Sequence, residues 1–138
     1  MIGVTADTNV YISAFVFAGV PRKFLLQAEA GRFRLAASEA ILNELRGVLL
    51  EKFAWSEIEV EEAIAHLAGC TTLVHPTQSL DVVPDDPDDN RVVECAVAAG
   101  SHFIVTGDGD LLRLGNFGGV QILKVADFLK IVDGPSSG

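Results

Sequence analysis

The chain has 138 residues, 49% of them hydrophobic and 21% charged, which argues against a disordered or fibrous protein and predicts one domain with a real core. Its formal net charge of −9 argues against a domain that holds nucleic acid through a broad basic surface. An enzyme that brings phosphate close by means of metal ions remains compatible with that charge.

No apolar run approaches the ~20 residues of a membrane helix, and the N-terminus lacks a signal-peptide pattern, so we expect a cytoplasmic protein without membrane contact. Cys70 and Cys95 form no CxxC motif, and no histidine lies near them at ligand spacing, so both are expected to be buried, reduced thiols. Residues 1–133 are expected to form the domain. The small polar run at 134–138 is expected to be a flexible tail, which expression cloning could have added.

Helix signals are strongest in the first half of the chain. Pro21 suits the first turn of one helix. Ser38 starts a longer helix, whose apolar residues recur at the i, i+4, i+7 and i+8 positions of a core-facing stripe. Ser56 and Glu59 have the spacing of a capping box. In chain order we expect a strand at 1–6, helices at 10–16 and 21–30, a strand at 33–37, and helices at 38–53 and 56–69.

Strands and helices also alternate in the second half. The expected elements there are strands at 71–75, 103–106 and 120–124, and helices at 91–99, near Leu111 and from Val125. The strands are continuous apolar runs, without the in-and-out alternation of a half-exposed sheet, which predicts a parallel sheet covered by helices on both faces. Neither an internal repeat nor a domain-splitting linker is present. The expected fold class is therefore α/β.

Acidic residues follow two of the expected strands. Asp7 comes directly after the first strand, and Asp108 and Asp110 come after the strand at 103–106. In open parallel sheets ligands bind beyond the carboxyl ends of the strands, so these acids should share one edge of the sheet. Each also has a simpler interpretation, because Asp7 could merely cap the following helix, and Asp108 and Asp110 could belong to a turn.

Two other acidic groups could reach this edge. Glu44 falls at the margin of the apolar stripe of its helix, where it either points along the edge of the core or is an ordinary surface glutamate. The run of Asp85, Asp86, Asp88 and Asp89 stands where aspartates cap helix N-termini, which accounts for one or two of the four. Asp89, just inside the helix, is the one expected to face the sheet edge.

Bringing four of these acids together would be costly without a cation. If Asp7, Glu44, Asp89 and Asp108 lay within about 8 Å of one another, each pair would repel by roughly 2 kcal/mol at an effective dielectric constant of about 20. Six such pairs would cost on the order of 10 kcal/mol, which is comparable to the whole stability of a domain. The hard divalent cations Mg²⁺ and Mn²⁺ offset that repulsion and leave coordination sites for water and phosphate.

Four sequence blocks together resemble the PIN-domain nucleases. They are ADTNVYIS at 6–13, ILNEL around Glu44, DDPDDNRVVECAVAAG at 85–100 and FIVTGDGDLL at 103–112. They most resemble the bacterial and archaeal VapC-like branch, described as the toxin components of toxin–antitoxin pairs. The similarity runs from Ile2 to about Leu129 with all blocks in order. The order and spacing carry the resemblance, because no single block is specific.

The resemblance implies a Rossmann-like α/β/α sandwich with a central parallel sheet, and a Mg²⁺- or Mn²⁺-dependent ribonuclease site. It also implies a homodimer and a small antitoxin protein that occludes the acids, for instance by inserting an arginine or lysine among them. The family's catalytic and metal-binding acids carry over as Asp7, Glu44, Asp89 and Asp108, with Asp110 as a frequent accessory. The polar positions that orient these acids carry over as Thr8, Asn9 and Thr106.

Other functions compete with this one. Related PIN domains process RNA without any antitoxin, and a PIN-like scaffold with a silent site could bind RNA or protein, although the intact set of acids argues against a silent site. A haloacid-dehalogenase-like phosphatase would need a second acid where this chain has Asn9. His66, His75 and His102 are scattered, and no GxxxxGK[ST] loop is present, so covalent catalysis and NTP hydrolysis find no support.

RNA binding by an acidic domain is expected to rest on the metal site and on local basic residues, because the net charge repels RNA at long range. The basic candidates are Arg22, Lys23, Arg32, Arg34 and Arg91. A second copy or an antitoxin is expected to contact the apolar surface of the first two helices. Phe15, Phe17 and Phe24 are the candidates, although burial in the core is the stronger interpretation of any one of them.

Overall fold

The computed structural model describes residues 1–134, so the tail predicted at 134–138 lies outside the described residues except for Gly134, which ends the last helix. The strands are β1 (Gly3–Ala6), β2 (Arg34–Ser38), β3 (Thr72–Val74), β4 (Phe103–Val105), β5 (Asn116–Phe117) and β6 (Val120–Leu123). The helices are α1 (Thr8–Val16), α2 (Val20–Glu29), α3 (Glu39–Glu51), α4 (Glu57–Cys70), α5 (Pro87–Ala99), α6 (Gly109–Leu114) and α7 (Val125–Asp133). None of these helices is long and apolar enough to cross a membrane.

The described strands form one sheet in the order β3-β2-β1-β4-β6-β5. β1 pairs in parallel with both β2 and β4, and only the short β5 is antiparallel, to β6. The strand order reverses between β1 and β4, since the chain builds outward from β1 to β3 on one side and from β4 on the other. A reversal of this kind opens a crevice beyond the carboxyl ends of the two central strands.

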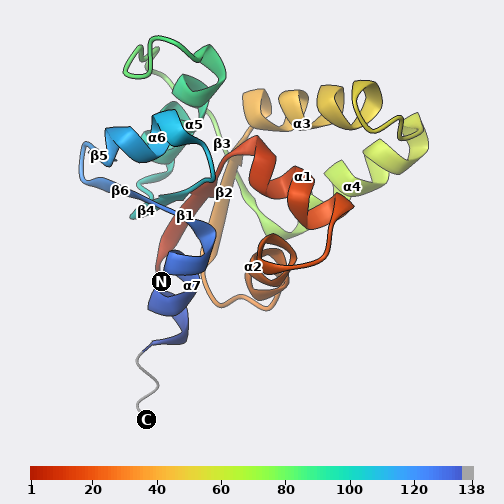
Figure 1. The fold of residues 1–138 in the computed structure, drawn as a ribbon, viewed down its shortest axis with the longest axis horizontal. Coiled ribbons are helices and arrows are strands. Elements are labelled where there is room, and N and C mark those ends of the chain that lie inside the picture. The colour runs from red at the N-terminus through yellow and green to blue at the C-terminus, as the bar shows by residue number, and fades with distance from the viewer. Residues whose placement is uncertain (135–138) are drawn as a thin grey trace.

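Helices cover both faces of the sheet. α5 packs on β1, β2 and β4, and α6 packs on β6 (Figure 1). α1, α2 and α4 lie on the other side, and α3 crosses the upper edge and reaches α5. The predicted α/β/α sandwich with a central, mostly parallel sheet is therefore confirmed.

Local sequence signals account for most of the helix ends. Ser56 accepts a hydrogen bond from the Glu59 N–H at 3.1 Å and the Glu59 carboxylate accepts one from the Ser56 N–H at 2.9 Å, so the predicted capping box is present. α5 begins at Pro87, four residues before the predicted start at 91, because Asp86 caps it and proline suits its first turn.

The β5–β6 hairpin was not predicted. Gly118 and Gly119 form its two-residue turn with φ values of 55° and 86°, a conformation that glycine adopts without strain. The Gly-Gly pair between two apolar residues was the available signal.

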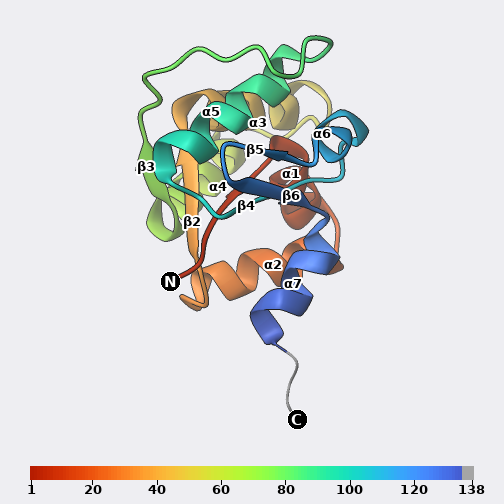
Figure 2. The ribbon, with the colours of Figure 1, turned by 90° about the vertical axis from the view of Figure 1, so that its left-hand side faces the viewer.

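Four phenylalanines close the core between α2, β4 and α7, and Figure 2 shows α2 and α7 next to each other at the lower end of the molecule. The Phe128 ring centroid lies 5.0 Å from that of Phe33, 5.6 Å from Phe103 and 5.8 Å from Phe24, with the rings arranged edge to face. Phe24 is 1% exposed. The expectation that it contacts a partner is therefore wrong, and its burial in the core is confirmed.

Replacing Phe128 with alanine should destabilise the fold by about 3–5 kcal/mol, because it empties the centre of this aromatic cluster. Ile131→Ala on the same helix is the control and should change stability by less than about 1 kcal/mol, since Ile131 is 44% exposed. Urea unfolding followed by circular dichroism measures both values. Equal losses in the two variants would show that α7 is not anchored through Phe128.

Candidate functional site

A pocket of about 510 Å³ lies at the carboxyl ends of β1 and β4, where the strand order reverses. Residues of α1, α3 and α5 complete its walls. Six acidic residues line it: Asp7, Glu44, Asp86, Asp88, Asp89 and Asp108. The four acids predicted to converge are among them, so the structure brings these four residues to one cavity.

Asp7 is held at the end of β1 by hydrogen bonds to both of its carboxylate oxygens. Oδ1 accepts from the Val10 N–H at 3.2 Å, which caps α1, and Oδ2 accepts from the Thr106 hydroxyl. The same hydroxyl accepts a hydrogen bond from the Asp108 N–H at 2.9 Å. Thr106 thus joins the two acidic strand ends. Burial raises the pKa of Asp7, and the Thr106 hydrogen bond partly offsets that rise.

Asp86, Asp89 and Asp108 are the closest group of acids in the pocket. Each places one carboxylate oxygen within 4.8 Å of those of the other two. Asp86 and Asp108 are also helix caps, since an Oδ1 atom of each accepts backbone N–H groups at the start of α5 and α6. The simple interpretation of Asp86 as a cap is therefore correct, whereas Asp108, for which a turn was the simple interpretation, caps α6. Capping does not exclude a second role for either residue.

Asp89 is the buried member of this group, at 6% exposure. Its Oδ2 atom has no hydrogen-bond partner among the described residues, which is costly for a buried carboxylate oxygen. Burial, followed by the charges of Asp108, Asp86 and Asp7, raises the pKa of Asp89 to about 8. A buried Asp89 carboxylate with an unpartnered Oδ2 atom is compatible with a bound cation or with a bound proton.

Glu44 lies half-buried on α3 and faces the pocket. Burial and the neighbouring charge of Asp88 raise its pKa to about 7, while a hydrogen bond with Thr8 acts in the opposite direction. Of the two interpretations that the sequence left open, the structure favours the one in which Glu44 points along the edge of the core.

The connection between β3 and α5, which runs across the top of Figure 2, carries Asp86 into the pocket. Asn90 fixes it by accepting hydrogen bonds from the Val82 and Val83 N–H groups, both at 2.8 Å. The buried Glu94 accepts from the Leu80 N–H at 2.7 Å. The first turns of α5 therefore hold the loop that delivers the acid.

Arg91 completes this support. Its guanidinium donates to both carboxylate oxygens of Glu94 at 2.7 Å and to the Leu80 carbonyl at 3.3 Å. Asp110, predicted as an accessory acid, pairs with Arg113 and is not part of the pocket lining, whereas Thr8 and Asn9 line it. Arg91 and Asp110 are thus engaged with neighbours on their own helices.

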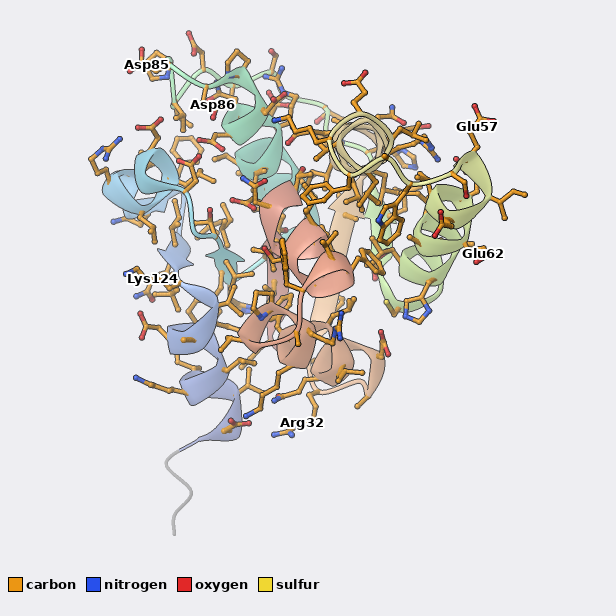
Figure 3. All side chains as sticks on the ribbon, turned by 45° about the vertical axis from the view of Figure 1, so that its right-hand side comes forward. Arg32, Glu57, Glu62, Asp85, Asp86 and Lys124 are labelled. Carbon is orange, nitrogen blue, oxygen red and sulfur yellow. The ribbon has the colours of Figure 1, made fainter. Side chains whose placement is uncertain are left out.

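None of the five predicted RNA contacts lines the pocket. Arg22 donates to the Ala14 carbonyl at 3.1 Å, and Arg32 lies 3.7 Å from the Asp133 carboxylate. Figure 3 shows Arg32 at the opposite end of the molecule from Asp86. Arg34 begins β2 and so lies at the amino edge of the sheet, and Lys23 lies on α2.

Sequence reasoning missed three charged residues of the pocket: Asp86, Asp88 and Lys52. Lys52 is the one basic residue in the lining among residues 1–134. It follows Glu44 by eight positions, so helical periodicity was a usable signal for it. The contribution of Asp86 depends on the path of the loop before α5, which no local pattern encodes, whereas Asp88 lies in the first turn of α5 next to Asp89.

The strand order and an acidic pocket at the point of reversal define a Rossmann-like α/β protein whose site is built from carboxylates. A sequence profile described as PIN domain matches residues 4–110, and the chain belongs to the PIN-domain family. The resemblance of the four sequence blocks to PIN domains is thereby confirmed. No curated protein sequence is significantly similar to the chain.

Several solved chains share the fold, among them chains of two VapBC structures. A chain of the VapBC2 complex of Rickettsia felis, bound to a DNA fragment from its promoter, gives a TM-score of 0.64 at 12% identity, covering 89% of this chain and 98% of that one. A chain of VapBC-1 from nontypeable Haemophilus influenzae gives a TM-score of 0.63 at 13% identity, and the match covers 91% of this chain and 99% of that one. At such identities the likeness establishes the fold alone.

The raised pKa values predict that the metal-free protein loses stability as pH rises from about 4 to about 8. The folded pKa values of Asp89 and Glu44, about 8 and about 7, lie above the usual values of 3.8 and 4.5. The folded state therefore binds more protons than the unfolded state in this window, and its stability falls with increasing pH. Thermal unfolding in EDTA at pH 5 and pH 8 measures the difference.

Asp89→Asn should flatten this pH dependence, because an amide carries no charge to be disfavoured. Asp85→Asn, at an exposed position outside the pocket, should keep the wild-type pH dependence. Equal stability of the wild-type protein at both pH values would contradict the raised pKa values of Asp89 and Glu44.

Proposed function

We propose that this PIN domain is a nuclease that hydrolyses phosphodiester bonds of single-stranded RNA with the help of Mg²⁺ or Mn²⁺. The observation that carries the proposal is the approach of three carboxylate oxygens within 4.8 Å, one of them from the buried Asp89. An all-oxygen donor set of this kind suits hard divalent cations. The unpartnered Oδ2 atom of Asp89 supports the same assignment.

Asp89 and Asp108 would hold the cation, with Asp86 beside them and Asp7 and Glu44 completing the site. A bound divalent cation lowers the pKa of a coordinated water and neutralises charge on the phosphodiester. The protein orients the carboxylates that would hold the cation. Thr106 fixes the Asp7 carboxylate, and the N–H groups at the start of α6 fix that of Asp108. Free Cys70 and Cys95 are in keeping with action in the reducing cytoplasm.

Purified protein should cleave a labelled single-stranded RNA with Mg²⁺ or Mn²⁺ and lose that activity in EDTA. Glu44→Gln and Asp89→Asn should each lower the rate at least about a hundredfold, because each removes a charge from the site while the fold persists. Glu51→Gln is the matched control on the same helix, and it should stay near wild type since Glu51 is exposed outside the pocket.

Calorimetry without RNA separates the metal site from the chemistry. Mn²⁺ should bind at millimolar concentration or below and should raise the unfolding temperature of the wild type more than that of Asp89→Asn. Neither binding nor stabilisation would rule out the metal site. Metal binding without cleavage would leave a silent PIN scaffold, and loss of activity in Glu51→Gln alone would show that α3 is wrongly oriented.

We further propose that the chain is the toxin component of a toxin–antitoxin pair and acts as a homodimer that a small antitoxin protein inhibits. The support is its family membership and its fold, shared with chains of two VapBC structures at TM-scores of 0.64 and 0.63. A pocket lined by six acids also suits an inhibitor that inserts a basic side chain.

Expression of the chain alone should arrest growth of a host cell, and Asp7→Asn should restore growth, because it removes a carboxylate that the proposed site requires. Co-expression of the neighbouring short reading frame should also restore growth, and size-exclusion chromatography should show a complex of the two products. If growth is unaffected and no such reading frame exists, the toxin role fails, and an RNA-processing nuclease without an antitoxin takes its place.

A further inference from the structure

We infer that the pocket contains a base-binding subsite in which an unpaired base of single-stranded RNA stacks on Phe17, beside Phe53, with a neighbouring phosphate against Lys52. The inference rests on the proposed nuclease function and specifies how its substrate is held. Besides the acids, the pocket is lined by a set of mainly apolar side chains with one lysine: Ile12, Phe17, Val48, Lys52, Phe53 and Val92.

α3 fixes the distance between the acids of the pocket and Lys52. Glu44, Val48 and Lys52 are spaced four residues apart and all line the pocket, so one side of the helix runs from the acids to the lysine. At a rise of about 1.5 Å per residue, Glu44 and Lys52 are separated by roughly 12 Å along the helix axis. An RNA strand with phosphates at both ends of this span would have one phosphate near the acids and another near Lys52.

Phe17 offers an open ring face. It is 56% exposed, and its ring centroid lies 6.3 Å from that of Phe53 with an interplanar angle of 78°. An edge-to-face pair covers at most one face of either ring. A large apolar side chain left this exposed inside a pocket is typical of a ligand contact.

The Phe17–Phe53 pair is one of two aromatic pairs that join the end of α1 to the turn after α3. Phe15 and Trp55 form the other pair, with ring centroids 6.3 Å apart and an interplanar angle of 69°. Both of these side chains are half-buried, and neither lines the pocket. Of these four aromatic side chains, Phe15, Phe53 and Trp55 pack against the core, whereas Phe17 is exposed and lines the pocket.

The positive charge of Lys52 favours an anionic ligand at this end of the pocket. Lys52 is exposed, and no ion pair engages it within the described part of the chain. An aromatic face beside a cation matches a base with its phosphate. A double helix stacks its bases internally and offers no free face, so the subsite selects unpaired RNA.

The test measures binding rather than cleavage. A short single-stranded RNA with one 2-aminopurine is titrated with protein in Ca²⁺, and quenching of its fluorescence reports stacking of that base. Phe17→Ala should weaken binding about tenfold and abolish the quenching, whereas Phe17→Tyr should retain both. Lys52→Gln should weaken binding and reduce the dependence of log affinity on log salt by about one.

Leu26→Ala is the control, because Leu26 has the same 56% exposure as Phe17 but lies on α2 outside the pocket, and it should bind as the wild type does. The inference is overturned if the wild type does not quench the probe, or if Phe17→Ala binds and quenches normally. Normal cleavage with either result would leave the nuclease function standing. Quenching without cleavage in Mg²⁺ or Mn²⁺ would retain the subsite and reject the nuclease.

Discussion

Electrostatic repulsion among the carboxylates at the carboxyl edge of the sheet is the constraint on which the rest of the site depends. Three oxygens within 4.8 Å of one another would repel by roughly 3 kcal/mol per pair at an effective dielectric constant of about 20, if all were charged. The protein offsets part of this cost locally. Asp7, Asp86 and Asp108 each cap a helix, so the N-termini of α1, α5 and α6 converge on the pocket with their partial positive charge.

Asp89 caps no helix. It lies inside the first turn of α5, is buried, and leaves Oδ2 without a partner among the described residues. Burial, followed by the charges of Asp108, Asp86 and Asp7, raises its pKa to about 8. The rigidity around it keeps this arrangement in place. Asn90 and Glu94, on the same helix, accept hydrogen bonds from backbone N–H groups of the preceding loop. These bonds keep Asp86 close to Asp89. A cation would find the donor atoms already assembled.

The overall charge and the local charge of the pocket have different consequences for RNA. A net charge of −9 disfavours long-range attraction, and the predicted basic contacts lie outside the pocket, with Arg32 and Arg91 engaged in ion pairs. If the chain binds RNA as proposed, attraction would come from the cation and from single groups such as Lys52, and stacking on Phe17 would add a contribution that does not depend on charge. A site of that kind would favour short unpaired segments over long duplexes.

The sequence by itself determined the features that depend on near neighbours. Alternating strands and helices, the Ser56–Glu59 capping box and the positions of Asp7 and Asp108 after two strands all follow from local patterns. Helices and caps form through hydrogen bonds between residues three or four apart, and strands show in the sequence as short apolar runs. A known sheet topology then places strand ends on one edge, so the convergence of Asp7 and Asp108 was predictable as well.

Only the tertiary structure decided the roles that depend on the paths of loops and on burial. The sequence left Glu44 open between core edge and surface, grouped Asp86 with simple caps, and assigned Arg91 to RNA, because it cannot show which side chain a distant segment covers. The loop held by Asn90 and Glu94 brought Asp86 to Asp108, and the turn after α3 set Phe53 and Lys52 beside Phe17. Contacts between segments far apart in the chain therefore fixed the composition of the pocket, since burial and charge at a residue are set by whatever packs against it.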